Sequence, residues 1–183
     1  MNDTQTALIL IDIQNDYFDG GKFPLAKPIA AASNSREILQ RFRANKQLVV
    51  HVQHDNVDDR KPFLQHGTEG QKIHASVAPA ADEIVVTKHF PNSFWQTELD
   101  AILKRNNISK ITLVGMMTHM CVSATARAAM ERGYQIAIVS DACATRELEF
   151  EHERLPAETV HKVALSEVAM FSKLMTTASY LAN

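Results

Sequence analysis

Three chemically complementary side chains follow apolar runs of this sequence. Asp12 follows the run 7–11, Lys88 follows the β-branched run 83–87, and Cys121 comes shortly after a third such run. Sites in parallel sheets lie at the carboxyl ends of the strands, where such residues meet. Taken singly, each has an ordinary alternative: a turn cap for the aspartate, a solvated strand end for the lysine and a small buried side chain for the cysteine. Their convergence on one edge favours a catalytic site.

The residues around Cys121 predict a strand, a tight turn and a helix. Residues 111–114 are typical of a strand buried on both faces, and Gly115 permits a sharp turn. Thr118 is a good helix N-cap, an alanine-rich segment follows, and Gly133 ends the helix. Cys121 then lies in the first helical turn, where the helix dipole and free N–H groups favour the thiolate.

These groups together would support amide hydrolysis without serine or histidine. The Cys121 thiolate would attack a carbonyl carbon, while Asp12 takes the thiol proton and later returns it to the leaving amine. Lys88 would stabilise both anions. Backbone N–H groups of Met117 and Cys121 would bind the developing oxyanion. Water would then cleave the acyl-enzyme.

Apolar strand runs alternate with amphipathic helical segments along the rest of the chain. We expect strands at 7–11, 47–53, 83–87, 111–114, 134–139 and 170–174, and helices at 28–45, 98–106, 118–133, 156–169 and the C-terminus. Helical spacing points six apolar side chains inward: Ile38, Leu39, Phe42, Leu99, Ile102 and Leu103. The alternation predicts an α/β fold with a parallel sheet and right-handed crossovers. At 183 residues, we expect one domain over 1–183.

The composition is that of an ordinary globular protein. A formal net charge of −2 gives no basic field, which argues against a nucleic-acid partner. Two cysteines, Cys121 and Cys143, provide no disulfide framework and indicate a reducing compartment. No apolar stretch is long enough for a membrane span, and the N-terminus lacks the basic segment of a signal peptide. The sequence therefore predicts a cytoplasmic protein without nucleic-acid or membrane partners.

The sequence resembles the isochorismatase-like cysteine hydrolases, a family that includes nicotinamidases. The matching segments occur in the family's order and spacing over most of the chain: 10–16, 87–88, 93–94, 114–122, 132–134 and 141–142. The resemblance implies that Asp12, Lys88 and Cys121 form the catalytic triad. It also implies a three-layer fold with a six-stranded parallel sheet of order 3-2-1-4-5-6, a cis peptide between Met116 and Met117, and a homodimer or homotetramer. No cofactor is expected.

One departure from the family concerns a metal site. Nicotinamidases carry an Asp-x-His motif just after the second strand and a further histidine downstream, whereas residues 53–56 here read Gln-His-Asp-Asn. His51 and His54 are spaced as a His-x-x-His pair, but residues three apart on a strand point to opposite faces. His66 and His74 lie in a loop region. The ligand set is incomplete, so we expect no metal, and the departure argues against nicotinamide as substrate.

The polar stretches after His54 and after Cys143 are expected to be loops, and loops 56–70 and 91–95 are expected to shape a small-molecule pocket. Candidate substrate contacts are Gln14, Phe18, Phe94, Trp95, Thr118 and His119. The aromatic side chains would stack on a flat or apolar acyl group, and the alternative is that they cap the core. His119 lies beside the predicted turn, with a spectator role as its alternative.

Three functions are compatible with this pattern. The first is a cysteine hydrolase that cleaves an amide-type C–N bond of a small molecule through an acyl-enzyme on Cys121. The second is isochorismatase-type hydrolysis of a vinyl ether with Asp12 as general acid, and the presence of the cysteine favours the first. The third is a non-catalytic small-ligand binding protein with a redox-sensitive Cys121, against which the intact triad argues.

Overall fold

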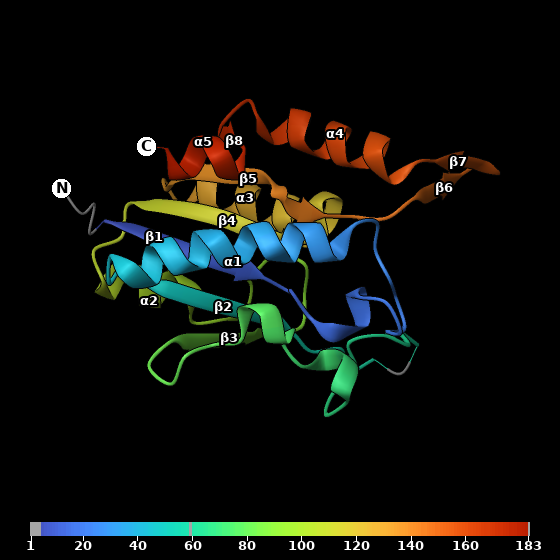
Figure 1. The fold of residues 1–183 in the computed structure, drawn as a ribbon, viewed down its shortest axis with the longest axis horizontal. Coiled ribbons are helices and arrows are strands. Elements are labelled where there is room, and N and C mark those ends of the chain that lie inside the picture. The colour runs from blue at the N-terminus through green and yellow to red at the C-terminus, as the bar shows by residue number, and fades with distance from the viewer. Residues whose placement is uncertain (1–4, 59, 183) are drawn as a thin grey trace.

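The computed structural model describes residues 5–58 and 60–182, and a six-stranded sheet forms its centre (Figure 1). The strands are β1 (Thr6–Ile11), β2 (Val49–His54), β3 (Ile84–Lys88), β4 (Lys110–Met116), β5 (Gln135–Ala144) and β8 (Lys173–Met175). Their order is β3-β2-β1-β4-β5-β8, and all neighbouring pairs are parallel. Counted along the chain, this confirms the expected order 3-2-1-4-5-6.

Helices cover both faces of the sheet and make the three layers that the sequence predicts. The helices are α1 (Pro28–Ala44), α2 (Leu99–Arg105), α3 (Ser123–Glu131), α4 (Ala157–Val168) and α5 (Thr177–Leu181). One face carries α1 and α5, and the other carries α2, α3 and α4 (Figure 1). The six side chains expected to point inward are all buried. Within the described part of the chain, no helix is long and apolar enough to cross a membrane.

Strand β1 lies inside the sheet between β2 and β4, with helices over both of its faces. Residues 7–11 are therefore almost completely buried, and only a run of apolar side chains fits such a position. The residue that follows, Asp12, emerges at the middle of the carboxyl edge. This is why an aspartate directly after a wholly apolar run could be read as a site residue.

Gly115 lies within β4, whereas the sequence predicted it in the turn after the strand. Its φ is 128°, and a Cβ atom there would collide with the carbonyl oxygen of Ile11, so the close approach of β4 to β1 requires glycine. The helix that follows begins as a π-helical turn, η4 (Thr118–Val122), and continues as α3. The prediction that Thr118 caps this helix is wrong: Met117 is the N-cap residue, and the Thr118 hydroxyl instead contacts the His161 ring, 2.9 Å from Nδ1.

The region after Cys143 also differs from the prediction of a polar loop. Strand β5 extends to Ala144, and β6 (Leu148–Phe150) pairs with β7 (Glu153–Leu155) as an antiparallel hairpin that projects beyond α4 (Figure 1). The turn residues Glu151 and His152 both have positive φ. The two strands pair only with each other and are largely exposed, so the sequence shows no apolar face. The turn also lacks the glycine or asparagine that usually marks such hairpins.

The long polar stretch after β2 packs against the segment after β1. It contains the 3-10 turns η2 (Glu69–Gln71) and η3 (Ala75–Val77), and a third turn, η1 (Asn15–Tyr17), follows Asp12. The amide of Asn15 donates to Lys72, and the amide of His74 donates to Ile13. These contacts place the stretch beside the carboxyl edge of the sheet.

Candidate active site

The three residues that the sequence singles out meet at the carboxyl edge of the sheet. Asp12 follows β1 in the left-handed region (φ 50°), Lys88 ends β3, and Cys121 lies in η4. All three are buried, with exposed fractions of 0%, 1% and 4%. Lys88 Nζ lies 2.7 Å from Asp12 Oδ2. A carboxylate oxygen of Asp12, Sγ of Cys121 and a ring nitrogen of His54 all lie within 4.8 Å of one another.

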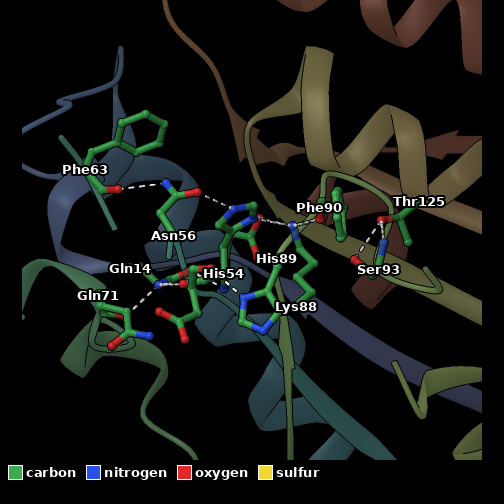
Figure 2. Close-up of polar contacts among 12 residues, drawn as sticks. Gln14, His54, Asn56, Phe63, Gln71, Lys88, His89, Phe90, Ser93 and Thr125 are labelled. Carbon is green, nitrogen blue, oxygen red and sulfur yellow. Dashed lines mark hydrogen bonds and ion pairs between the residues drawn. The ribbon is translucent and has the colours of Figure 1, made fainter. Parts of the chain in front are cut away.

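Lys88 has three polar partners around its ammonium group, one ion-paired and two hydrogen-bonded. Besides Asp12 Oδ2, they are the Phe90 carbonyl and His54 Nδ1, each 3.0 Å from Nζ (Figure 2). A lysine ammonium can only donate, so His54 Nδ1 is the acceptor and the proton of the neutral ring is on Nε2. Nε2 lies 2.9 Å from Asn56 Oδ1 and donates to it. The Lys88 ammonium is thus held from three sides.

The electrostatics of the cluster keep Lys88 charged. Burial alone would lower the pKa of Lys88, but the Asp12 carboxylate, and after it the neighbouring Cys121, raise it above its ordinary value. For Cys121, burial first and the Asp12 carboxylate second raise the thiol pKa to about 12, and Lys88 offsets only part of this rise. The expectation that the helix start favours a resting thiolate is therefore wrong, because burial outweighs the helix dipole. The cysteine rests as a thiol and needs a base.

Asp12 is placed to be that base. Both carboxylate oxygens of Asp12 are buried and accept no hydrogen bond from the residues that the structure describes, although Oδ2 forms the ion pair with Lys88. A buried carboxylate oxygen without a donor is costly unless something supplies one. The Cys121 thiol is a neighbouring donor, and the carboxylate is close enough to raise the pKa of that thiol.

The backbone around Met117 bears on the predicted oxyanion site. The peptide between Met116 and Met117 is cis, as the resemblance implies. The Met117 carbonyl accepts hydrogen bonds from the amides of Met120 and Val122. Within the described chain, the Cys121 amide does not donate to it. Binding of an oxyanion by the amides of Met117 and Cys121 stays a prediction.

The loop after β3 is tied to the helix that follows Cys121. Ser93 contacts Thr125 of α3 twice: its amide donates to Thr125 Oγ1 at 3.1 Å, and the two hydroxyl oxygens lie 2.8 Å apart (Figure 2). This loop also supplies the Phe90 carbonyl that holds Lys88. The connection fixes the lysine relative to the cysteine.

Gln14 serves the protein backbone in this structure. Its side-chain amide donates to the His54 carbonyl and accepts from the His54 amide, both at 2.8 Å, and also donates to the Gln71 carbonyl (Figure 2). The residue is fully buried. The sequence proposed a substrate contact here, but both ends of this side chain are occupied within the protein.

The aromatic candidates lie in different surroundings. Phe18 is buried and stacks on His74, with ring centroids 3.7 Å apart, and Phe94 is buried and stacks on Tyr134 at 5.9 Å. Arg132 lies over the other side of Phe94, 4.9 Å from its ring centroid. Both positions match the alternative in which these rings cap the core. Trp95 is 54% exposed.

The two polar candidates of η4 contact neighbouring elements. The Thr118 hydroxyl pairs with His161 of α4, and His119 Nδ1 lies 2.5 Å from Thr145 Oγ1 after β5. A cavity of about 310 Å³ is lined by Thr145, His161 and Cys143, among others. A larger cavity, about 760 Å³, lies at the opposite edge of the sheet, where β1, β4 and β5 begin. The triad lines neither cavity.

A fixed cation lies among the atoms near the triad that could hold a metal ion. Asp12, His54 and Cys121 are the one group of three or more such residues within reach of a common ion in the described ranges. Lys88 Nζ contacts two of the three, so a metal ion there would have to compete with the lysine charge. His51 faces the other way and pairs with Glu83, 2.8 Å from Nε2, which confirms that the two β2 histidines lie on opposite faces.

Sequence reasoning missed His54 and Tyr17 as parts of the site. His54 had a signal: it ends β2, beside the strand that ends with Lys88, and strands in register place their last residues side by side. Tyr17 is buried beside Phe23 and Phe63. Burial first, and then the charges of Cys121 and Asp12, raise the pKa of Tyr17. No periodicity distinguishes such a tyrosine from an ordinary core residue.

Comparison with known proteins adds four similarities. The isochorismatase domain model matches residues 6–179. The uncharacterized isochorismatase family protein YddQ of Bacillus subtilis is 42% identical over 177 residues, which cover 96% of this chain and 98% of that protein. Maleamate amidohydrolase of Pseudomonas putida is 29% identical, over 76% of this chain and 72% of its own. A crystal structure from Oleispira antarctica, assigned as an isochorismatase hydrolase, superposes with a TM-score of 0.95 at 42% identity and covers 99% of this chain and 98% of its own.

Proposed function

Because the chain belongs to the isochorismatase family of hydrolases, we propose that it cleaves an amide-type C–N bond of a small molecule through an acyl-enzyme on Cys121. The observation that carries this proposal is the buried Asp12–Lys88 ion pair beside the Cys121 thiol. A buried carboxylate whose oxygens accept no hydrogen bond from the described residues is poised to accept the thiol proton.

The proposed reaction begins with proton transfer. As Sγ of Cys121 attacks the carbonyl carbon, its proton moves to Asp12, so no free thiolate has to accumulate in a site that raises the thiol pKa. Lys88 balances the negative charge that passes between sulfur and carboxylate. The amides of Met117 and Cys121 bind the oxyanion.

Collapse of the tetrahedral intermediate breaks the C–N bond, and Asp12 gives its proton to the departing nitrogen. Asp12 then takes a proton from water as the water attacks the thioester, and Cys121 leaves as the thiol. An amine leaves readily only when it is protonated. Asp12 lies beside the nucleophile and can supply this proton. The similarity to maleamate amidohydrolase, which is named for amide cleavage, supports this bond type.

Two properties of the working protein complete the proposal. A thiol nucleophile works only while reduced, so we expect a reducing compartment such as the cytoplasm. We also expect a homodimer or homotetramer.

A screen with a covalent readout tests the function. Purified protein is incubated with small primary amides, ureides and isochorismate, and intact mass and released ammonia or amine are measured, with Cys121→Ala as control. We expect an acyl adduct on Cys121 and no amide turnover in the control. Amide turnover that survives in Cys121→Ala would exclude the cysteine mechanism.

The same screen separates the other two functions. Isochorismate turnover that persists in Cys121→Ala would assign vinyl ether hydrolysis with Asp12 as the acid. Rapid stoichiometric alkylation of Cys121 without turnover of any compound would favour a binding protein with a redox-sensitive cysteine.

A further inference from the structure

His54 is the most constrained histidine near the triad. Gln14 fixes its backbone through both the amide and the carbonyl, and the residue is buried with an exposed fraction of 7%. Its ring contacts Lys88 through Nδ1 and Asn56 through Nε2. The Asn56 amide in turn donates to the Phe63 carbonyl at 2.8 Å (Figure 2). The ring therefore has one orientation and one tautomer.

This arrangement works only with a neutral ring. A protonated His54 would carry an N–H at Nδ1, facing an ammonium N–H of Lys88 across 3.0 Å. The lysine would then lose one acceptor and gain a like charge beside it. Asp12 Oδ2 lies 3.9 Å from Nδ1, so the protonated ring would compete with Lys88 for this carboxylate.

The charged groups around His54 come from four elements. Asp12 after β1 favours protonation of the ring, whereas Lys88 of β3 and Lys61 of the loop between β2 and β3 oppose it, and Cys121 of η4 lies within 4.8 Å. Burial is the largest influence and lowers the pKa of His54 below its ordinary 6.5. The ring is therefore neutral at neutral pH.

We propose that His54, oriented by Asn56, is a positioning residue that holds the Lys88 ammonium between Asp12 and Cys121, and that protonation of His54 releases the lysine and switches the site off. The proposal rests on the proposed role of Lys88 in the reaction. Its test uses the reactivity of Cys121 toward iodoacetamide, which needs no substrate. Failure of the hydrolase function and failure of this proposal are thus distinguishable.

Two substitutions at His54 separate an acceptor from a mere filler of space. In His54→Asn, the amide oxygen occupies the place of Nδ1 and accepts from Lys88, but cannot titrate. In His54→Leu, a side chain of similar size offers no acceptor and leaves one buried ammonium proton unpaired. At pH 8 we expect Cys121 in His54→Asn to be alkylated at a rate within about threefold of the parent. In His54→Leu we expect the rate to be reduced at least about tenfold relative to the parent.

The pH profile gives the decisive readout. The high pKa of the Cys121 thiol makes alkylation decline with falling pH in every variant. In the parent, an additional acid limb should appear below the ordinary histidine pKa of about 6.5, as His54 takes a proton. His54→Asn should lack this additional acid limb. Asn56→Asp places a carboxylate against Nε2, which favours the imidazolium and raises the pKa of His54, so its acid limb should move to higher pH. Where a substrate is known, kcat/KM should follow the same three profiles.

A matched control lies on the same strand. His51→Asn changes a buried histidine of β2 that faces away from the triad, and it should leave the acid limb in place. The proposal is overturned if His54→Leu and His54→Asn react equally fast, or if Asn56→Asp keeps the parent profile. If His54→Leu does not fold, the profiles of His54→Asn and Asn56→Asp decide alone.

Discussion

Strand β2 carries a histidine on each face, and each belongs to a cluster with a carboxylate and a cation. The outer cluster consists of His51, Glu83 and Arg43. Glu83 Oε1 accepts from Arg43 at 2.7 Å, and Oε2 lies 2.8 Å from His51 Nε2 and accepts from the Ala80 amide. Both oxygens of this carboxylate have donors, and the atom of the cluster without a hydrogen-bond partner among the described residues is His51 Nδ1.

The inner cluster consists of His54, Asp12 and Lys88, and it differs at the carboxylate. Here the ammonium donates to His54 and Phe90 and forms an ion pair with Asp12, but neither carboxylate oxygen accepts a hydrogen bond from the described residues, and Cys121 lies next to them. Similar groups on the same strand therefore yield a stabilising cluster on one face and a reactive one on the other. An unused acceptor beside a nucleophile makes the difference, rather than the presence of charges.

The largest expected effect comes from removing the unused acceptor. In Asp12→Asn, the amide oxygen can still accept from Lys88, but the group cannot take the thiol proton. We expect kcat/KM for the amide substrate to fall about 10²- to 10⁴-fold, the usual contribution of a general base. Glu83→Gln, the same change in the outer cluster, should leave kcat/KM within about twofold, since it removes no acid–base group from the site. A residual rate above one tenth in Asp12→Asn would mean that another group takes the proton.

A second prediction tests how the inner cluster is held. Gln14→Leu leaves the amide and carbonyl of His54 without their buried partners, so we expect the free energy of unfolding to fall by about 2 to 4 kcal/mol in chemical denaturation. Gln53→Leu is the matched control. Gln53 is only partly buried and donates a single bond, to the Gln71 carbonyl, so the loss should stay below about 1 kcal/mol. Equal losses would contradict the assignment of Gln14 as a backbone clamp.

This contrast also shows what sequence patterns can and cannot reveal. Strand β1 and the position of Asp12 after it were predictable, because a fully buried parallel strand requires a continuous apolar run. The role of Gln14 was not, because its partners lie 40 and 57 residues away and depend on how the loop after β2 packs. The pKa of Cys121 was predicted in the wrong direction, because helix position is visible in a sequence and burial by distant segments is not.

The hairpin of β6 and β7 illustrates a related limit. Pattern analysis detects elements that bury an apolar face, whereas this hairpin is largely exposed and its turn at Glu151 lacks the usual residue types. The approach of Asp12, Lys88 and Cys121 to one another was predictable because each lies next to a buried strand. Such a strand is recognised in the sequence by its continuous apolar run.

A third prediction uses the outer cluster and pH. Burial alone would raise the pKa of Glu83, but hydrogen bonds from Arg43 and Ala80 lower it from 4.5 to about 2. A carboxyl with a lowered pKa stabilises the fold above about pH 4.5 and loses this contribution as pH falls toward 2. We expect about 1 to 2 kcal/mol from this residue. The unfolding free energy of Glu83→Gln should therefore fall less steeply than that of the parent between pH 4.5 and 2, and parallel curves would contradict the assignment.

The smallest expected effect concerns metal. The Lys88 ammonium already contacts Asp12 and His54, so a divalent ion would have to displace a charge that the site holds by one ion pair and two hydrogen bonds. We expect treatment with EDTA to leave amide turnover within twofold, and loss of turnover restored by Zn²⁺ would contradict this. Lys88→Met sharpens the point: without the ammonium, Asp12, His54 and Cys121 offer a carboxylate, an imidazole and a thiol within 4.8 Å. That variant should bind Zn²⁺ more tightly than the parent in calorimetric titration, because the lysine is what keeps a suitable set of ligands from acting as one.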